Sequence, residues 1–387
     1  MKIDDKTSHN SPSLRFPEFT GEWKNTTLEE CVDFLDGQRK PIKSDDRKGE
    51  KRLYPYYGAS GIIDYIDEYI FDGDYILLSE DGANIIDRNY RVAFIANGKI
   101  WVNNHAHVLQ PHKEMNINFL SEALERINYA IYNTGTTMPK LNQEICRKIN
   151  LNVPSLSEQN KIGNLLYLLN ERIATQNRLI DRLQSLIKGI NRTIFTGSGL
   201  EYSLCDVCEI RSGYSGNQLQ GGKGLGVSRI ETISAHNINL ERIGYVAPFD
   251  ASENYRLQVG DILFSNINSV EYIGNTAFID KDYNLYHGMN LLRLIPFRNV
   301  VVPFYLYILL NTNRMLKHFK TICNKAVSQA SINQKELGKT IVMLPSLEKQ
   351  KQVCNIYQAM YSKLKTEKDV LSFYQEQKRY LLRHMFI

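Results

Sequence analysis

The sequence predicts an α+β protein with two globular domains joined by two long antiparallel helices, which form a coiled coil related by a pseudo-two-fold internal repeat. Three observations lead to this fold class. The chain repeats a segment of itself at a fixed offset, each copy ends in a long heptad pattern, and each globular part mixes strand-like runs with helical ones. The 387 residues are 43% hydrophobic and 23% charged, a globular composition that excludes wholesale disorder.

The internal repeat defines the domain organisation. Residues 152–159 (NVPSLSEQ) recur as residues 343–350 (MLPSLEKQ), a shift of 191 positions. The same shift carries residues 141–143 (LNQ) onto residues 332–334 (INQ). Because one offset holds for both matches, we expect two copies of one plan, each a variable globular part followed by a shared tail.

Each shared tail predicts one long helix, over residues 154–196 in the first copy and residues 345–387 in the second. Along both helices, seam positions recur in alternating steps of four and three residues, and most of them are apolar. Such a heptad pattern favours a coiled coil and requires a partner helix. The expected seam consists of Ile162, Leu166, Leu169, Ile173, Gln176, Ile180, Leu183, Ile187 and Ile190 in the first helix, and of Val353, Tyr357, Met360, Leu364, Glu367, Leu371, Tyr374 and Leu381 in the second.

A polar residue interrupts the two seams at equivalent places, Gln176 in the first and Glu367 in the second. In an antiparallel pair both residues lie near the middle, where a polar pair costs stability but sets the register. The alternative is that one or both side chains lean towards solvent. Each long helix could also pack on its own globular part, although the strict seven-residue period favours pairing between the helices.

Both globular parts mix short strands with helices. Residues 75–78, 92–95 and 107–109 are predicted strands, bounded by turn sequences such as Asp-Gly and Asn-Gly. Residues 119–132 are a predicted helix, and residues 304–319 are its counterpart in the second copy. This mixture assigns both parts to the α+β class.

Three features of the composition limit which partner and which cellular compartment are expected: the net charge, the cysteines and the start of the chain. The net charge of +5, from 47 Lys and Arg against 42 Asp and Glu, is compatible with a nucleic-acid partner without requiring one. The polar start (MKIDDKTSHNSP) is unlike a secretory signal, and no apolar run is long enough to span a bilayer. The six scattered cysteines are therefore expected to be reduced thiols in the cytoplasm. Cys205 and Cys208 have the spacing of half a zinc site, but no second pair follows, so we expect no metal.

Three segments could carry binding chemistry. Residues 39–52 hold seven Lys or Arg against three acids, and they predict either a basic loop suited to phosphate oxygens or a merely solvated one. The glycine-rich residues 213–226 fit neither a Walker loop nor a dinucleotide fingerprint, so we interpret them as a flexible basic loop that can enter a groove. His105 and His107 lie on one strand face. Without a third ligand or a placed acid, structural or base-contacting roles are favoured over a metal or catalytic pair.

No sequence signature of an enzyme active site is present. The chain has no HExxH motif, no GxSxG nucleophile elbow and no tetrad like Asn-Pro-Pro-Tyr. The acids Asp72, Asp74, Glu80 and Asp81 only weakly imitate a nuclease metal site, because the first two flank a glycine in a predicted turn. We therefore expect a binding protein and not an enzyme.

The arrangement of the repeated segments resembles the specificity subunits of type I restriction–modification enzymes. In both copies a globular part is followed by a helix that opens with Pro-Ser-Leu-x-x-Gln, at residues 154–159 and 345–350. Residues 14–19 (LRFPEF), followed by Trp23, are similar to the usual entry of a first target-recognition domain. Residues 54–61 (YPYYGASG) are similar to a common subclass of these domains, whereas the second globular part lacks the Tyr-Tyr-Gly segment.

The resemblance implies a DNA-reading subunit without an active site of its own. In this family two modification (methyltransferase) subunits dock on the helical region, and restriction (endonuclease and translocase) subunits join them. No cofactor is then expected on this chain, because S-adenosylmethionine, ATP and Mg²⁺ belong to the partner subunits, and no membrane is involved. The implied organisation is a polar N-terminal segment over residues 1–13, a first target-recognition domain over 14–153, a central shared helix over 154–196, a second target-recognition domain over 197–344 and a C-terminal shared helix over 345–387.

The geometry of two domains on paired helices then predicts how double-stranded DNA is read. Helices of about 38 residues extend roughly 57 Å, enough to separate two half-sites one helical turn, about 34 Å, apart. Because the two globular parts differ, we expect an asymmetric bipartite target with one domain per half-site. The helices would set the length of the unread spacer.

Candidate DNA contacts follow from loop position and side-chain chemistry. Lys and Arg suit phosphate oxygens, while Asn, Gln, Ser, Arg and His suit base edges. The candidates are Arg39, Lys40, Ser79, Asn84, Arg88, His105, Thr137 and Lys140 in the first domain, and Arg211, Ser212, Tyr214, Lys223, Arg229, Asn266, Asn268, Lys325, Ser328 and Gln329 in the second.

Three other classes of function remain open at this point. One is a fused enzyme, which methyl transfer by the isolated chain would support. A coiled-coil scaffold whose globular ends bind proteins would protect no split DNA sequence in a footprint. A tandem RNA-binding module, whose 23 tyrosines would offer stacking surfaces, would prefer single-stranded RNA over duplex DNA.

Overall fold

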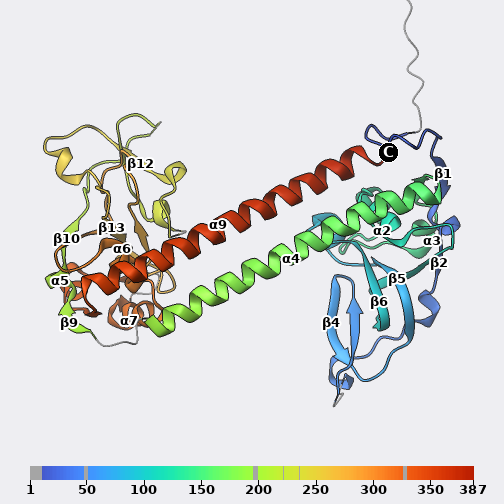
Figure 1. Cartoon of the computed structure of the whole chain (residues 1–387), viewed down its shortest axis with the longest axis horizontal. Coiled ribbons are helices and arrows are strands. Elements are labelled where there is room, and N and C mark those ends of the chain that lie inside the picture. Colours follow the sequence, from blue (N-terminus) through green and yellow to red (C-terminus); the bar gives the residue numbers. More distant parts are fainter. Residues whose placement is uncertain (1–10, 48–50, 195–198, 221, 235, 326–328) are drawn as a thin grey trace, which may run out of the picture. The chain divides into compact units, whose positions relative to one another are not determined.

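The chain divides into two compact units in a computed structural model that describes all residues except 1–10, 48–50, 195–198, 221, 235 and 326–328. Unit 1 comprises Met1–Leu179 and Glu367–Ile387, and unit 2 comprises Ile180–Thr366. Both divisions fall within a long helix, α4 (Leu156–Ile194) or α9 (Leu347–His384), so each unit contains one end of each helix (Figure 1). Two units of mixed helix and sheet with two long helices confirm the predicted α+β class.

Unit 1 is built on a six-stranded sheet with the strand order β2-β7-β5-β6-β3-β4. Neighbouring strands are antiparallel except β3 and β6, which run parallel. The strands predicted at residues 75–78, 92–95 and 107–109 are confirmed as parts of β5, β6 and β7. The bounds are β2 (Val32–Phe34), β3 (Tyr54–Gly58), β4 (Gly61–Ile66), β5 (Phe71–Ser79), β6 (Ala93–Val102) and β7 (Ala106–Pro111).

The central strand β5 is apolar on both of its faces, which is why its sequence shows a continuous apolar run. Ile76 and Leu78 belong to a core cluster that includes Leu120 of helix α2 (Ile117–Glu125). Leu77, which points to the opposite face, belongs to a second cluster formed by the sheet itself. Helix α2 therefore covers one face of this sheet.

Two predicted helices are shorter than expected. The helix predicted over residues 119–132 ends at Glu125, and Tyr129–Tyr132 forms a separate 3-10 turn. The helix predicted over residues 304–319 is two helices, α6 (Pro303–Leu310) and α7 (Asn313–Ile322). The break occurs because the hydroxyl of Thr312 accepts the backbone N–H of Met315 and caps a new helix there.

Unit 2 contains a four-stranded antiparallel sheet with the order β10-β16-β13-β15. Its remaining strands form three small antiparallel sheets, β11-β12, β14-β18-β17 and β9-β19. The bounds are β9 (Leu200–Ser203), β10 (Cys208–Ser212), β11 (Leu225–Val227), β12 (Gly244–Val246), β13 (Ile262–Phe264), β14 (Ile267–Asn268), β15 (Thr276–Phe278), β16 (Leu292–Pro296), β17 (Asn324–Lys325), β18 (Ala330–Ser331) and β19 (Ile341–Leu344). The short helices are α1 (Asn84–Asp87) and α3 (Gln143–Arg147) in unit 1, and α5 (Leu204–Val207) and α8 (Gln334–Gly338) in unit 2.

The two units share one strand order. The arrangement β2-β7-β5-β6 in unit 1 corresponds to β10-β16-β13-β15 in unit 2. Before each long helix a two-stranded ladder recurs, β1 (Lys24–Thr27) with β8 (Asn150–Val153) and β9 with β19. The units differ in the segment between their first two sheet strands, which holds the β3–β4 hairpin in unit 1 and the β11–β12 pair in unit 2. A common frame thus carries two different insertions.

Within unit 1 the two long helices run antiparallel and pack against each other and the globular part. Ile162, near the start of α4, shares an apolar cluster with Met385, just after α9, and with Phe119 of α2. Further along α4, Gln176 donates its side-chain amide to the backbone carbonyl of Glu367 at 2.9 Å and to the Glu367 carboxylate. Both side chains are buried, so of the two alternatives for these polar residues the structure shows the pair.

The predicted seam residues are buried or half-buried throughout. The buried ones are Ile162, Leu166, Leu169, Gln176, Ile180, Ile187, Val353, Tyr357, Leu364 and Glu367, and the half-buried ones are Ile173, Leu183, Ile190, Met360, Leu371, Tyr374 and Leu381. Among the described residues, none of the helices has both the length and the apolar character needed to cross a membrane.

Candidate nucleic-acid interface

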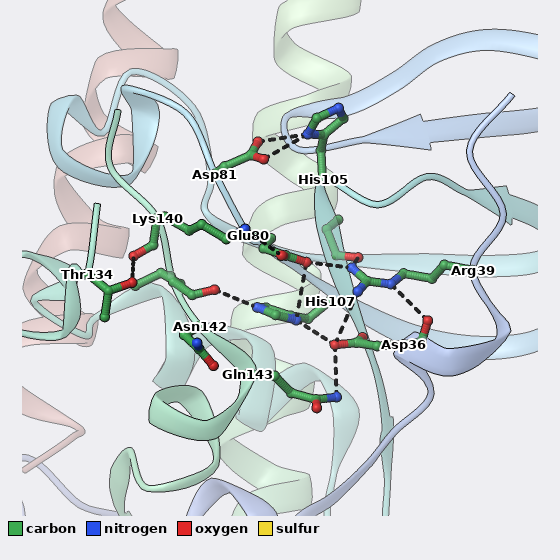
Figure 2. Close-up of polar contacts among 12 residues, drawn as sticks. Asp36, Arg39, Glu80, Asp81, His105, His107, Thr134, Lys140, Asn142 and Gln143 are labelled. Carbon is green, nitrogen blue, oxygen red and sulfur yellow. Dashed lines mark hydrogen bonds and ion pairs between the residues drawn. The ribbon is translucent and has the colours of Figure 1, made fainter. Parts of the chain in front are cut away.

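In unit 1, several candidate residues meet where β5 ends and the 134–141 loop crosses it (Figure 2). The backbone N–H of Leu141 donates to the carbonyl of Glu80 at 2.7 Å, and the N–H of Gly82 donates to the carbonyl of Pro139 at 3.0 Å. From the other side, Glu80 donates its own N–H to the carbonyl of His105 at 2.9 Å. We call this meeting of β5, the start of β7 and the 134–141 loop the unit 1 rim.

Arg39 lies beneath the unit 1 rim and is committed to contacts within the chain. Its guanidinium forms an ion pair with Glu80 at 2.7 Å and a longer one with Asp36 at 3.5 Å, and it donates to the carbonyl of Ala106 at 2.7 Å. Only 13% of the side chain is exposed. In this structure Arg39 holds Glu80 and the backbone of Ala106 together, and little of its side chain is accessible to a ligand.

His107 is buried, and its imidazolium supports the 134–141 loop. Its Nδ1 lies 2.6 Å from Asp36, and its Nε2 donates to the carbonyl of Leu141 at 3.0 Å. Burial disfavours the charged ring, but hydrogen bonding to Asp36 and Cys146 and the negative charge of Asp36 outweigh that effect and raise the pKa of His107 to about 10. The amide of Gln143 also donates to Asp36, so this carboxylate joins the turn after β2 to β7 and α3.

The side chains at the top of the unit 1 rim are exposed. His105 is 50% exposed and its Nδ1 lies 2.8 Å from the Asp81 carboxylate. Lys140 is 52% exposed and lies 3.4 Å from Glu80, and Thr137 on the same loop is exposed. Together they offer a cation, a hydroxyl, an imidazole and a carboxylate, which are groups able to contact phosphate oxygens and base edges.

The other candidates of unit 1 lie in different settings. Ser79 is buried, and its hydroxyl donates to the carbonyl of Ala59 with the carbonyl of Val92 also in reach, so it does not reach solvent here. Asn84 closes a turn with the backbone of residue 90, and Arg88 pairs with Glu125 at 2.9 Å. Lys40 is exposed. The sequence predicted loop positions for Ser79, Asn84 and Arg88. It does not show that Ser79 and Arg88 have partners distant in the chain, Ala59 and Glu125.

Unit 2 has an equivalent rim at the end of β13. The backbone N–H of Ile332 donates to the carbonyl of Asn266 at 2.8 Å, as Leu141 does to Glu80 in unit 1. Asn266 returns a side-chain bond from its Nδ2 to the carbonyl of Ile332 at 3.3 Å. We call β14, β17 and β18, together with Asn266 and Gln329, the unit 2 rim.

The described residues of the unit 2 rim are mostly polar and include no Asp or Glu. Asn268 donates to the Ser265 hydroxyl at 3.1 Å, and both Lys325 and Gln329 are exposed. Ser328, a further candidate, lies outside the described residues. The two rims thus share a backbone arrangement and differ in side-chain chemistry.

A pocket of about 430 Å³ lies beside the edge strand β10 in unit 2. It is lined by the candidates Arg211 and Ser212 and by residues that the sequence did not single out, Asn254, Tyr255, His287, Arg293 and Gln334. A sequence signal was present for one of them, because a single arginine interrupts the apolar strand Leu292–Pro296. The buried Arg293 pairs with the buried Asp261 at 2.7 Å.

The remaining candidates of unit 2 flank this pocket or lie on the glycine-rich segment. Arg211 is exposed and holds Glu209 at 2.7 Å, and Arg229 is exposed and lies 3.6 Å from Glu231. The ring of Tyr214 stacks on Phe249 at 3.7 Å between centroids and is half-buried, so it is a packing residue in this structure. Lys223 is exposed, as predicted for a basic loop.

The described residues contain no group of three His, Cys, Asp or Glu side chains arranged to hold a metal ion. The buried Cys208 thiol has a pKa raised to about 12 by burial, which disfavours the thiolate that binds zinc. His105 and His107 each face a carboxylate of their own, Asp81 and Asp36, so each has the placed acid that the sequence did not show.

Comparisons with known proteins agree with the two-copy architecture. A family model for the type I restriction modification DNA specificity domain matches residues 20–185 and 200–372. A putative type I restriction enzyme MjaX specificity subunit from Methanocaldococcus jannaschii is 38% identical over 187 residues, which are 47% of this chain. That match spans only 44% of the relative's own length.

Two further relatives extend over nearly the whole chain. The type I restriction enzyme MjaVIII specificity subunit of the same organism is 24% identical, over 94% of this chain and 90% of that one. Among solved structures, a type I restriction-modification system S subunit from M. genitalium has a TM-score of 0.68 at 17% identity, covering 97% of this chain and 99% of that chain. This second likeness shows a common fold.

Proposed function

The chain belongs to the type I restriction–modification DNA specificity family, and from this premise we propose that it is the subunit that selects the DNA sequence. Each unit reads one half of an asymmetric bipartite target in double-stranded DNA, and the long helices set the unread spacer. The observation that carries the proposal is one strand order repeated in two units with different insertions.

The chemistry of the two rims supports an asymmetric target. The unit 1 rim exposes His105 and Lys140 beside a half-buried Asp81, whereas the unit 2 rim exposes Lys325 and Gln329. A carboxylate accepts hydrogen bonds and a glutamine amide both donates and accepts, so the two sets suit different base edges. Identical units would have read a palindrome.

The chemical steps belong to partner subunits in this proposal. Two modification subunits dock on the helical region and supply methyl transfer from S-adenosylmethionine, and restriction subunits with ATP and Mg²⁺ join them in the cytoplasm. The chain itself contributes recognition and spacing without a catalytic residue. In keeping with this role, the Asp36 carboxylate, 9% exposed, is occupied by bonds within the chain to His107, Arg39 and Gln143.

The test is a footprint of the complex reconstituted with its modification subunits on duplex DNA. We expect two protected half-sites separated by an unprotected spacer, and methylation within both halves. Inserting four residues into each long helix lengthens both by about 6 Å and should widen the spacer by about two base pairs. A continuous footprint, an unchanged spacer or a preference for single-stranded RNA would contradict the proposal.

A further inference from the structure

Gln159 is a buried residue at the end of the repeated Pro-Ser-Leu-x-x-Gln segment, one turn into helix α4. Its Oε1 accepts the backbone N–H of Asn116 at 2.9 Å. Its Nε2 donates to the carbonyl of Pro154 at 3.0 Å and to the carbonyl of Glu114 at 3.2 Å. Both amide hydrogens and one oxygen lone pair are therefore bonded to backbone.

Gln350 makes the same three bonds in unit 2, at the start of helix α9. Its Oε1 accepts the N–H of Val302 at 2.8 Å, and its Nε2 donates to the carbonyls of Pro345 at 2.9 Å and Val300 at 3.3 Å. The two glutamines are 2% and 1% exposed. The identical pattern in two units whose other contacts differ indicates that the bonds serve a purpose common to both.

These bonds join each long helix to the helix that packs on its sheet. Asn116 is the N-cap residue of α2, and Val302 is the N-cap residue of α6. Each glutamine also reaches back to the proline that precedes its own helix. A buried amide with three backbone partners holds its neighbours in one arrangement, because any tilt of the long helix would leave polar groups without partners in an apolar environment.

The length of the long helices makes the angle at this joint important. Helix α4 has 39 residues, which corresponds to about 58 Å at 1.5 Å per residue. A change of about 10° in the direction in which the helix leaves its globular part moves its far end by about 10 Å. On duplex DNA that displacement corresponds to about three base pairs. A spacer defined to one base pair therefore needs a joint held within a few degrees.

We propose that Gln159 and Gln350 are positioning residues that set the angle between each long helix and its globular part, and so restrict the spacer length that the protein accepts. This inference rests on the proposed function, because it concerns the distance between two half-sites. It adds a role for the repeated Pro-Ser-Leu-x-x-Gln segment. The proline and the glutamine, five positions apart, are the two ends of one hydrogen-bonded clamp.

The test uses Gln159→Met, Gln350→Met and the double variant in the reconstituted complex. Methionine keeps the length and helix preference of glutamine but forms none of the three bonds. Gln352→Met is the matched control, since this glutamine lies on α9 two residues further along and is exposed. Binding is measured on duplexes whose half-sites are separated by the cognate spacer and by spacers one or two base pairs shorter or longer.

In the clamp variants we expect the preference for the cognate spacer over its neighbours to fall by about tenfold, which is the scale of one lost buried hydrogen bond. The control keeps the wild-type preference. A uniform loss of affinity on all spacers, with an unchanged preference, would overturn the inference because it would show a purely structural role. Failure of both single variants to fold would overturn it as well, whereas either variant that folds carries the test for its own unit.

The wild-type complex separates this inference from the proposed function. If wild type shows no split footprint, the proposed function is wrong and the clamp has no spacer to restrict. If wild type shows a split footprint of one spacer length and the clamp variants keep it unchanged, only the clamp is refuted.

Discussion

Glu80 follows the end of β5 in unit 1, and Asn266 follows the equivalent end of β13 in unit 2. The backbone is used in the same way at both places, because Leu141 and Ile332 donate their N–H groups to the two carbonyls. The side chains are used differently: Glu80 pairs with Arg39, while Asn266 donates to the carbonyl of Ile332. Each rim is therefore held by an equivalent backbone hydrogen bond, which does not depend on the side chain at that position. The side chains of the two rims can differ without changing this backbone arrangement.

A buried histidine in each unit shows a further contrast, His107 beneath the unit 1 rim and His287 in the pocket beside β10. His107 in unit 1 faces Asp36 and is charged, with a pKa of about 10. His287 in unit 2 donates its Nε2–H to the carbonyl of Leu291, and burial lowers its pKa to about 4. Unit 1 thus holds a charged histidine in an ion pair beneath its rim, whereas unit 2 holds a neutral histidine in the pocket beside β10. If these differences are independent properties of each unit, an exchange within one unit leaves the other unit unchanged.

The largest effect is expected from exchanging a whole globular part. Replacing residues 14–150 with the first globular part of another family member should change one half of the recognised sequence and leave the other half intact. The reason is that unit 2 keeps its own insertions and its own rim. Mapping the methylated adenines in a host that carries the chimera measures this, and a change in both halves would show that the units do not act separately.

A smaller effect, on the free energy of unfolding, is expected from replacing two residues of unit 1 with the residue types found at the equivalent positions of unit 2. In unit 2, Ser212 of β10 pairs with Leu292 of β16. The equivalent positions of unit 1 hold Asp36 in place of Ser212 and His107 in place of Leu292. The variant His107→Leu should lose about 3 kcal/mol of unfolding free energy, the low end for a broken buried ion pair, because Arg39 stays 3.5 Å from the remaining carboxylate. Adding Asp36→Ser should restore part of this loss.

Urea unfolding of the full chain measures both of these changes. Leu292→Met in unit 2 serves as the control, since a volume-conserving exchange usually costs less than about 1.5 kcal/mol. Equal losses in the single and double variants would mean that Asp36 does not depend on the charge of His107.

The pH dependence of stability should also differ between the units. A raised pKa means that the contribution of His107 is complete below its ordinary pKa of 6.5 and is lost as the pH rises towards 10. The lowered pKa of His287 has the opposite sign, so its contribution is complete above 6.5 and is lost as the pH falls towards 4. Each histidine contributes a slope of at most about 1.4 kcal/mol per pH unit in its own window.

Proton NMR of the histidine rings in the intact chain measures these two titrations directly. The resonance of His107 is identified by its loss in His107→Leu, and that of His287 by its loss in His287→Gln. Two rings titrating together near their ordinary pKa would remove the contrast between the units.

The sequence predicted those parts of the fold that repeat or follow a period. The offset of 191 positions is itself the separation of Gln176 and Glu367, so the symmetry that predicts their meeting can be read without coordinates. The apolar run at residues 75–78 likewise predicts β5 from local residues alone. Periodicity and repetition can be read from the sequence. They correspond to structure because regularly spaced apolar residues are buried together on one face of a helix or strand.

Side-chain partners far apart in the chain could not be predicted in the same way. Arg39 was expected to face a ligand, yet it lies under the rim because Glu80, 41 residues away, arrives beside it through sheet pairing. Ser79 was assigned to a loop, although it is the last residue of β5 and buried. Only the strand order brings such residues together, and that order is decided by packing over the whole unit.

The smallest expected effect concerns single cations at the two rims. Lys325 is exposed on the unit 2 rim, whereas Lys140 on the unit 1 rim lies 3.4 Å from Glu80. If both contact phosphate oxygens, Lys325→Ala should lower the slope of log binding constant against log salt concentration by about 1, and Lys140→Ala by less, because Glu80 already neutralises part of that charge. Lys339→Ala, which removes an exposed lysine paired with Glu336 on helix α8, should leave the slope unchanged. Equal decreases for Lys140 and Lys325 would show that the ion pair opens when DNA binds, and the two rims would then be electrostatically alike in the complex despite their different partners in the free protein.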